Sequence, residues 1–469
     1  MRTRTGMRWS AALVLVTSVF ATSVQAQPPA DPFVGASGLG EAYYPDDGNG
    51  GYHVDHYAVA ISYDPPSRQL TGNARLDAVA TQALRMFDLD FSGPQVRRVT
   101  VNGMPAGFVR HGEHKVSVTP SLPVLPGLPF TVTVDYAGPA TQNEEGGWTF
   151  SPSGGAFAAG EPHSASTWYP LNDTPSDKAT FDLRVTVPQE WQVISNGVRV
   201  RDDVDGPNRT VEWVSQHPTL GYLTTVAIDH FDFLDQTRAN GTPMISAFAP
   251  GAARARELEQ RLPEVLDFIE SLYGPYPFES AGGIYVDTDL NFSLETQTRP
   301  IYAPWTDLDT VVHENTHQWW GDSVSVRQWS DVCLNECFAS YTADYLWPES
   351  KEGADVDARY RKTIAERLDD PKFWEIPLQN PGAGREFTSV YYRGPLFLHA
   401  LRRLVGDAVF FSATRDFVQS HAYGNASMPE FRQFVQSRAG MDLSGFFEAW
   451  LDRATVPAPE YLFPGSLRA

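Results

Sequence analysis

The sequence predicts an α+β protein of more than one domain, in which a β domain precedes a mainly helical domain. Between residues 52 and 233 hydrophobic and other side chains alternate, as in Tyr57, Val59 and Ile61, which is the pattern of half-buried strands. After about residue 240 the hydrophobic period lengthens to that of a helix. With 469 residues, 42% of them hydrophobic, the chain is long enough for two to three domains.

The β half contains further alternating runs separated by turn residues. Residues 130–136 and 181–187 repeat the alternation. Asn102-Gly103 and Asn196-Gly197 are typical of tight turns between strands. We therefore predict that the β domain extends from residue 27 to residue 239.

The helical half begins after a change of period near residue 240. Hydrophobic residues at helical spacing mark its first helix: Leu258, Leu262, Val265, Leu266, Ile269 and Leu272. Gly274 and Pro275 end this helix. From Thr310 to Trp450 one helical pattern follows another. We predict a second domain over residues 240–469.

The N-terminus resembles a secretory signal peptide. Three arginines precede an apolar run over residues 9–20, and Val24-Gln25-Ala26 fits a small-x-small cleavage site. A run of about a dozen apolar residues is too short to cross a bilayer. We predict a signal peptide over residues 1–26, a secreted (extracellular or periplasmic) protein without a membrane anchor, and a loose lead-in from residue 27 to about residue 50, where Pro, Gly, Ala and Asp are frequent.

The charge balance is acidic, with 36 Lys plus Arg against 57 Asp plus Glu and a net charge of −21. Such a surface repels phosphate backbones, so we expect no nucleic-acid partner. The two cysteines, Cys333 and Cys337, are too few to build a disulfide scaffold. Residues four apart on a helix lie within disulfide reach, and both a bridge and two free thiols are open at this point.

The strongest motif is His313-Glu314-Asn315-Thr316-His317. Histidines at positions i and i+4 lie on one face of a helix, so both imidazoles can bind one metal ion. Glu314 follows the first histidine directly, where its carboxylate can hold a metal-bound water.

A second helix offers the third ligand. Glu336 follows His317 by nineteen positions, in a stretch from Ser330 that we expect to be helical after a loop. Two antiparallel helices can bring this carboxylate beside the histidines, which leaves a fourth zinc position open for water. Two neutral histidines and one carboxylate keep the site positive and lower the pKa of the bound water to about 7.

This pattern resembles the aminopeptidase N and leukotriene hydrolase family of gluzincin zinc metallopeptidases. Those enzymes have His-Glu-x-x-His, eighteen residues and then Glu, in the context Leu-Asn-Glu-Gly-Phe-Ala. The chain has His313 to Glu336 at that spacing, with Cys337 where glycine is usual. The resemblance implies one zinc ion per chain, bound by His313, His317 and Glu336.

The resemblance covers nearly the whole chain. The Pro-rich segment 170–181 is similar to one at the centre of the family's saddle-like antiparallel β domain. That implies a β saddle followed by a thermolysin-like, mainly helical catalytic domain. Tyr391, in Tyr391-Tyr392-Arg393-Gly394, matches the family's transition-state tyrosine. The chain ends at Ala469, so we expect a short two-domain member without the family's C-terminal helical domain.

Two acidic residues match the family's amine-binding positions. Glu295, in Phe292-Ser293-Leu294-Glu295-Thr296, stands where the family has the glutamate of Gly-Ala-Met-Glu-Asn. Counting twelve positions back from Asp173 places the second acidic residue at Glu161. The resemblance implies that Glu295 and Glu161 bind the free amino group of a peptide.

Together these features predict a secreted, monomeric zinc aminopeptidase that removes N-terminal residues from peptides. In this hypothesis Glu314 is the general base on the zinc-bound water, and zinc and Tyr391 stabilise the oxyanion. Three alternatives stay open: a zinc endopeptidase, a non-peptide (epoxide-type) hydrolase on the same site, and a non-catalytic peptide-binding protein.

Overall fold

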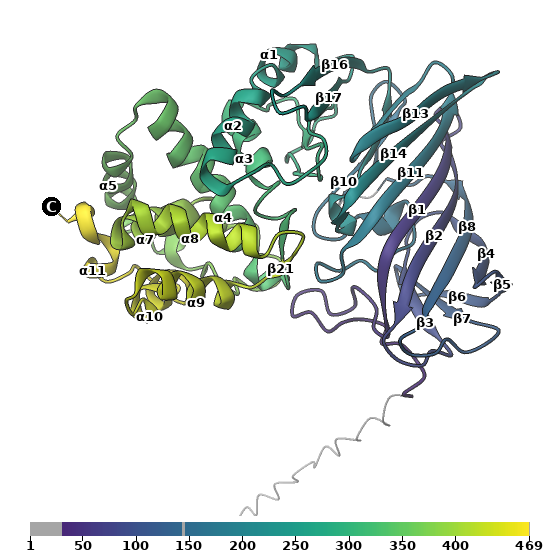
Figure 1. Ribbon diagram of the computed structural model, residues 1–469, viewed down its shortest axis with the longest axis horizontal. Helices are drawn as coiled ribbons and strands as arrows, with labels where there is room; N and C mark the ends of the chain where they lie inside the picture. The colour runs from purple at the N-terminus through teal and green to yellow at the C-terminus, as the bar shows by residue number, and fades with distance from the viewer. Residues whose placement is uncertain (1–30, 143–145, 469) are drawn as a thin grey trace, which may run out of the picture. The chain divides into compact units, whose positions relative to one another are not determined.

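The N-terminal half is built around a long twisted sheet (Figure 1). The computed structural model describes residues 31–142 and 146–468; the predicted signal peptide and its cleavage site at Ala26 lie outside these residues. Within them, eight strands form the sheet in the order β13 (Val198–Asp205), β14 (Asn208–Thr219), β11 (Ala179–Pro188), β1 (Tyr52–Asp64), β2 (Gln69–Ala80), β8 (Pro129–Pro139), β4 (Gln95–Val101) and β5 (Met104–Pro105).

Alternation of buried and more exposed residues accounts for these strands. Along β2, Leu70, Ala74 and Leu76 are fully buried, whereas the alternate residues Thr71, Asn73 and Arg75 are exposed. Neighbouring strands of the sheet are antiparallel, apart from β1 and β11, which run parallel with Val59 opposite Leu183. The sequence between β1 and β11 exceeds a hundred residues, so no hairpin turn imposes an antiparallel pairing on them.

Two smaller sheets complete the β half. One has the order β12 (Gln192–Ser195), β15 (Val226–Asp229), β10 (Ala156–Ala159) and β9 (Gly147–Phe150), and the other β3 (Phe87–Asp90), β7 (Lys115–Thr119) and β6 (Gly107–His111). Asn102-Gly103 forms the predicted turn between β4 and β5, with both residues at positive φ. Asn196-Gly197 instead links β12 to β13, which belong to different sheets, so the predicted hairpin there is wrong.

The second half contains a further sheet and most of the helices. The sheet has the order β16 (Asp232–Thr237), β17 (Pro243–Phe248), β18 (Ile284–Tyr285) and β19 (Ile301–Tyr302). A two-stranded pair joins β20 (Val324–Val326) to β21 (Gly424–Ala426). The helices are α1 (Arg256–Glu259), α2 (Leu262–Tyr273), α3 (Leu308–Thr316), α4 (Cys333–Tyr341), α5 (Val356–Arg367), α6 (Pro371–Trp374), α7 (Arg393–Val405), α8 (Asp407–Ser420), α9 (Met428–Ala439), α10 (Ser444–Phe447) and α11 (Pro459–Leu462).

The boundary predicted at residue 240 falls in the turn between β16 and β17, two strands that pair with each other. The described residues from Pro32 onward form one compact unit by their contacts, so the position of a domain boundary stays a prediction. Among the residues described, no helix has both the length and the apolar character that crossing a membrane requires.

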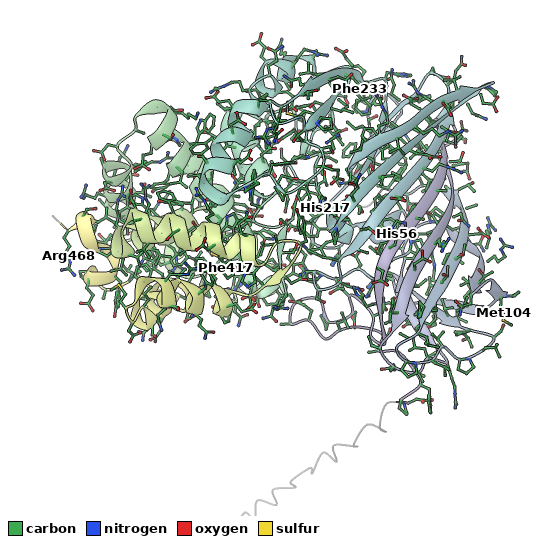
Figure 2. All side chains as sticks on the ribbon, in the orientation of Figure 1. His56, Met104, His217, Phe233, Phe417 and Arg468 are labelled. Carbon is green, nitrogen blue, oxygen red and sulfur yellow. A yellow bond between two sulfur atoms is a disulfide. The ribbon has the colours of Figure 1, made fainter. Side chains whose placement is uncertain are left out.

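Aromatic side chains fill the helical core. Trp320 stacks on Phe338 with 3.7 Å between ring centroids, and Phe417 (Figure 2) stacks on Trp320 with 5.9 Å between centroids. Cys333 and Cys337 form a disulfide on α4, one on each side of Glu336 along the chain. A Cβ at Gly394 of α7 would lie 2.5 Å from the Cys337 sulfur, so glycine is required where α7 packs on α4.

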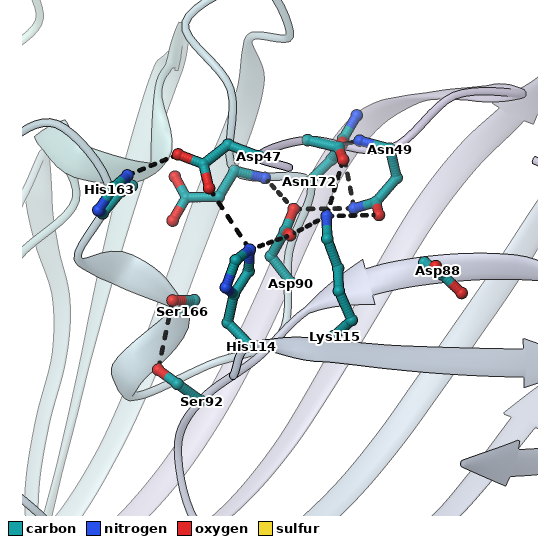
Figure 3. A network of polar contacts seen from close by, with 12 residues as sticks. Asp47, Asn49, Asp88, Asp90, Ser92, His114, Lys115, His163, Ser166 and Asn172 are labelled. Carbon is teal, nitrogen blue, oxygen red and sulfur yellow. Dashed lines mark hydrogen bonds and ion pairs between the residues drawn. The ribbon is translucent and has the colours of Figure 1, made fainter. Parts of the chain in front are cut away.

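Residues 27–30 of the predicted lead-in lie outside the described residues, but its later part is held in place, contrary to the loose segment that we predicted. A polar network anchors its C-terminal end to the β half (Figure 3): Asn49 donates to Asp90 at 2.8 Å, and the Lys115 ammonium donates to the Gly48 carbonyl, also at 2.8 Å. Asp47 pairs with His114 at 3.4 Å in the same network. Buried partners therefore order a segment whose composition suggests flexibility.

Contacts between the two halves position the metal-binding motif. The buried Lys178, from the Pro-rich segment, donates to the carbonyls of Asp322 and Ser323 at 2.6 and 3.0 Å. His217 of β14 (Figure 2) hydrogen-bonds Glu279 at 2.7 Å and stacks on Tyr423. The turn after His317 is thus held by Lys178, which directly precedes β11 of the β half.

Candidate active site

Three predicted metal ligands converge. The Nε2 atoms of His313 and His317 are 3.1 Å apart, and Glu336 Oε2 lies 3.2 Å from the first and 3.4 Å from the second. Zinc–ligand bonds of about 2.0–2.1 Å at tetrahedral angles place ligand atoms roughly 3.3 Å apart. The triangle therefore fits one tetrahedral zinc ion with a fourth position open.

Local helix geometry and helix packing build this triangle. Asp307 caps α3 by accepting from the Thr310 amide at 3.0 Å, which sets the start of the helix. His313 and His317 then lie four residues apart on one face. Helix α4 packs against α3 and brings Glu336, 3% exposed, to the histidines. Burial alone would raise the pKa of Glu336, but His317 and His313 hold it well below its usual range.

A backbone contact orients His317. Its Nδ1 lies 2.9 Å from the Trp320 carbonyl, which can only accept, so Nδ1 carries the proton and Nε2 is free to bind metal. Gly321, with φ of +133°, follows this carbonyl. A Cβ at Gly321 would lie 3.2 Å from His317 Nδ1, so a side chain there would crowd the imidazole.

Glu314 lies beside one of the predicted metal ligands, His317. One ligand atom each of Glu314, Glu295 and His317 falls within 4.8 Å of the others. Glu314 is buried and lines the cavity described below. Burial raises the pKa of this carboxylate well above its usual range, which suits a group that accepts and returns a proton.

The two predicted amine-binding residues also reach this place. Glu295 is 2% exposed and accepts a long hydrogen bond of 3.4 Å from the Tyr222 phenol. Glu161, 134 positions earlier in the chain, lines the same cavity, and its Oε1 has no partner in the described part of the structure. Burial and the charge of Glu295 raise the pKa of Glu161 well above its usual range. Two close carboxylates without a cation suit a cationic ligand.

Two adjacent tyrosines differ in their surroundings. Tyr391 is partly buried, with its ring centroid 6.1 Å from that of His313. Tyr392 is 70% exposed, although both residues line the cavity. Burial raises the pKa of Tyr391 well above its usual range, so its phenol stays protonated and can donate a hydrogen bond.

These residues line a cavity of about 680 Å³. Sequence reasoning missed several of its features. Tyr222 and the Trp320 carbonyl contact the lining residues Glu295 and His317 from behind the cavity wall. They gave no local signal, because the first contact is distant in sequence and the second is made by the backbone. Asp309 also lines the cavity, and its position four residues before His313 was a signal that helical spacing offered.

Two family models match the chain. The peptidase M1 N-terminal domain matches residues 53–223, and the peptidase family M1 domain matches residues 284–450; together they cover more than two thirds of the sequence. This chain belongs to peptidase family M1. The predicted family and the order of a mostly β part before a helical part are confirmed, and with the family its class of zinc metallopeptidase.

Solved M1 structures share the fold. An M1 zinc metallopeptidase from Deinococcus radiodurans is 28% identical with a TM-score of 0.82, and the match covers 90% of this chain and 98% of that one. A mutant of the Deinococcus enzyme bound to a Tyr-Ser-Ala substrate is 27% identical, also with a TM-score of 0.82, over 90% of this chain and 99% of that one.

Curated M1 relatives are longer. Aminopeptidase M1-B of Oryza sativa subsp. japonica is 23% identical over 85% of this chain and 48% of its own length. The human (Homo sapiens) endoplasmic reticulum aminopeptidase 1 is 24% identical over 79% of this chain and 44% of its own length. The chain therefore spans about half the length of these relatives.

Proposed function

We propose that this M1 family member is an aminopeptidase that removes single N-terminal residues from peptides with zinc bound at His313, His317 and Glu336. The observation that carries the proposal is the placement of Glu295 and Glu161 at the edge of the metal triangle. An ammonium group is the cation that every unmodified peptide N-terminus offers, because its pKa of about 7.7 to 8 leaves it largely protonated at neutral pH.

Anchoring the ammonium would set the register. Glu295 and Glu161 hold the N-terminus through charge-assisted hydrogen bonds, and only the first peptide bond then lies over the metal ligands. Tyr222, which donates to Glu295, holds the carboxylate in place. An internal peptide bond has no ammonium beside it and would leave both carboxylates without a partner.

Zinc, when bound, supplies a Lewis acid that polarises the scissile carbonyl and the attacking water. Glu314 accepts a proton from that water and delivers it to the leaving nitrogen. The Tyr391 phenol donates a hydrogen bond to the developing oxyanion. His313 and His317 remain neutral ligands, the second fixed by the Trp320 carbonyl.

The test compares free and N-acetylated aminoacyl amides, with leucine 7-amido-4-methylcoumarin and its acetylated form as the first pair. The free substrate should have a kcat/KM at least a hundredfold higher, since the acetyl group removes the cation and leaves a carboxylate desolvated. A chelator should abolish both rates. Equal cleavage of free and acetylated substrates, or internal cuts in blocked peptides, would refute the aminopeptidase assignment.

We also propose that the protein is exported. The arginines and the apolar run before Ala26 support this, as does the Cys333–Cys337 disulfide, because such bonds persist in oxidising compartments. N-terminal sequencing of the protein from its native host should begin at Gln27. Full-length protein in the cytoplasmic fraction would refute export.

A further inference from the structure

The helix face that carries the two histidine ligands continues to a third cavity residue. Asp309, His313 and His317 follow one another at intervals of four residues on and just beyond α3. All three line the cavity. At a rise of 1.5 Å per residue, successive members of this row are about 6 Å apart along the helix. Along this row the cavity therefore has two ends, one at His317 and the other at Asp309.

The amine-binding end lies at His317. Glu295 belongs to the close group with His317 and Glu314, and Glu161 interacts electrostatically with His317. Asp309 is on the other side of His313. On the facing segment, Asp344 stands eight residues after Glu336 in the π-helical turn η5 (Thr342–Leu346), which packs against α3 and lines the cavity. Asp344 interacts electrostatically with His313.

This arrangement assigns a place to the second residue of a substrate. With the ammonium at Glu295 and Glu161, the first peptide bond lies over the metal ligands. An extended chain advances about 3.3 Å per residue, so the second residue would lie beyond the metal ligands, on the side of His313 that holds Asp309 and Asp344.

The cavity lining as a whole is acidic. Among the described residues that line the cavity, six are carboxylates, two are histidines and none is Lys or Arg. The Asp309 side chain has no hydrogen bond or ion pair within the described part of the chain, and its charged neighbours are Asp307, Glu352 and Arg359. Arg359 is the nearby cation; it lies outside the cavity lining and pairs with Asp344 at 3.7 Å.

We propose that Asp309, supported by Asp344, makes the subsite for the second residue selective for Lys or Arg. The proposal rests on the proposed aminopeptidase function and deepens it by naming the substrate class. The same charges disfavour an acidic second residue and the free carboxylate of a dipeptide, for which the described cavity lining offers no cationic side chain.

The test uses zinc-loaded protein and the amides Leu-Lys-Ala-NH2, Leu-Gln-Ala-NH2 and Leu-Glu-Ala-NH2, which differ only in the second residue. At low ionic strength kcat/KM should fall in that order, with about a tenfold ratio between Lys and Glu that shrinks in 0.5 M salt. Asp309→Asn should lower the Lys/Glu ratio at least threefold. Leu-Gln should be cleaved at least fivefold more slowly than Leu-Gln-NH2.

Asp307→Asn is the matched control. Asp307 also stands at the start of α3 and carries the same charge, but it caps the helix and does not line the cavity. Asparagine keeps the cap. A purely structural role of negative charge at this helix end predicts equal effects of the two variants on melting temperature and no effect of either on the Lys/Glu ratio.

Equal rates for the Lys and Glu peptides, or the same Lys/Glu ratio in both variants, would overturn the selectivity. Leucine p-nitroanilide, which has no second residue, separates the two proposals. If the protein hydrolyses this substrate without discriminating among the peptides, the selectivity alone fails. If it hydrolyses none of them, the proposed function fails as well.

Discussion

The phenol of Tyr44 donates a hydrogen bond to the carboxylate of Glu386, a residue 342 positions further along the chain. Tyr43, beside it, bonds Asn380 at 2.7 Å and accepts from the Gly382 amide at 2.9 Å. The lead-in therefore holds the loop that runs into Tyr391. The same segment is tied to the β half at Asn49, so one short stretch connects both halves near the cavity.

Removing the Tyr44 hydroxyl should destabilise the protein. Glu386 is 1% exposed and its second oxygen has no partner within the described residues, so Tyr44→Phe leaves the buried carboxylate still less satisfied. We expect a loss of about 1–3 kcal/mol in the free energy of unfolding, measured by denaturant titration. Tyr43→Phe is the control, since its partners Asn380 and Gly382 are exposed and half-buried, respectively, and water can replace the lost bonds. Equal effects of both variants would contradict this account.

Replacement of Glu314, the proposed general base, should lower the catalytic rate without affecting folding or zinc binding. Glu314→Gln is nearly isosteric and leaves the three ligands untouched, so zinc content and melting temperature should stay close to wild type. We expect kcat to fall by about a thousandfold or more. Metal analysis and steady-state kinetics on the same preparation check both expectations. A variant as active as wild type would remove Glu314 from the mechanism.

The third ligand can be tested against a nearby acid. Glu336→Ala removes one corner of the triangle and should lower zinc affinity by at least a hundredfold, measured by competition with a chelator. Asp331→Asn is the control, because Asp331 is also buried but interacts with Gln379 at 3.3 Å and lies outside the triangle. Equal zinc retention in both variants would show that the ligand is misassigned.

The two tyrosines make a second matched pair. Tyr391→Phe should reduce kcat by about a hundredfold with little change in KM, because the lost hydrogen bond forms in the transition state. Tyr392→Phe, at the exposed neighbour, should change kcat less than threefold. The result that would contradict the assignment is a larger effect at Tyr392 than at Tyr391.

His399 predicts part of the pH dependence of stability. Burial lowers the pKa of this histidine to about 4, and its Nε2 lies 2.9 Å from Asp357. The unfolded chain, with an ordinary histidine pKa of about 6.5, binds the proton more readily in this range. The contribution of His399 is therefore present above pH 6.5 and is lost as the pH falls toward 4.

The expected slope is about 1.4 kcal/mol per pH unit between these values, or roughly 3 kcal/mol in total. Denaturant titrations of wild type and His399→Gln from pH 7 to pH 4 give the free energy of unfolding of each protein as a function of pH. The contribution of His399 is the difference between the slopes of these two curves. Parallel curves would mean that other groups account for the whole acid sensitivity.

Local spacing explains why the sequence alone predicted three side chains that come together and the order of the two halves. His313 and His317 share a face in any α-helix, and the β period of residues 57–63 persists because alternate side chains face opposite sides of a strand. Glu336 was identified from its spacing to His317, which implies a return helix. Each of these features depends on residues near one another in the chain.

Only the tertiary structure decided which distant groups meet. The contact of Tyr222 with Glu295 joins residues 73 positions apart, and the bond from Tyr44 to Glu386 joins residues 342 positions apart. The parallel pairing of β1 with β11 joins strands separated by more than a hundred residues. No periodicity encodes such pairs, because each forms only where two separately folded surfaces pack together. The lead-in illustrates the point: its composition indicated a loose segment, and the buried partners that order it are supplied by residues from both halves of the protein.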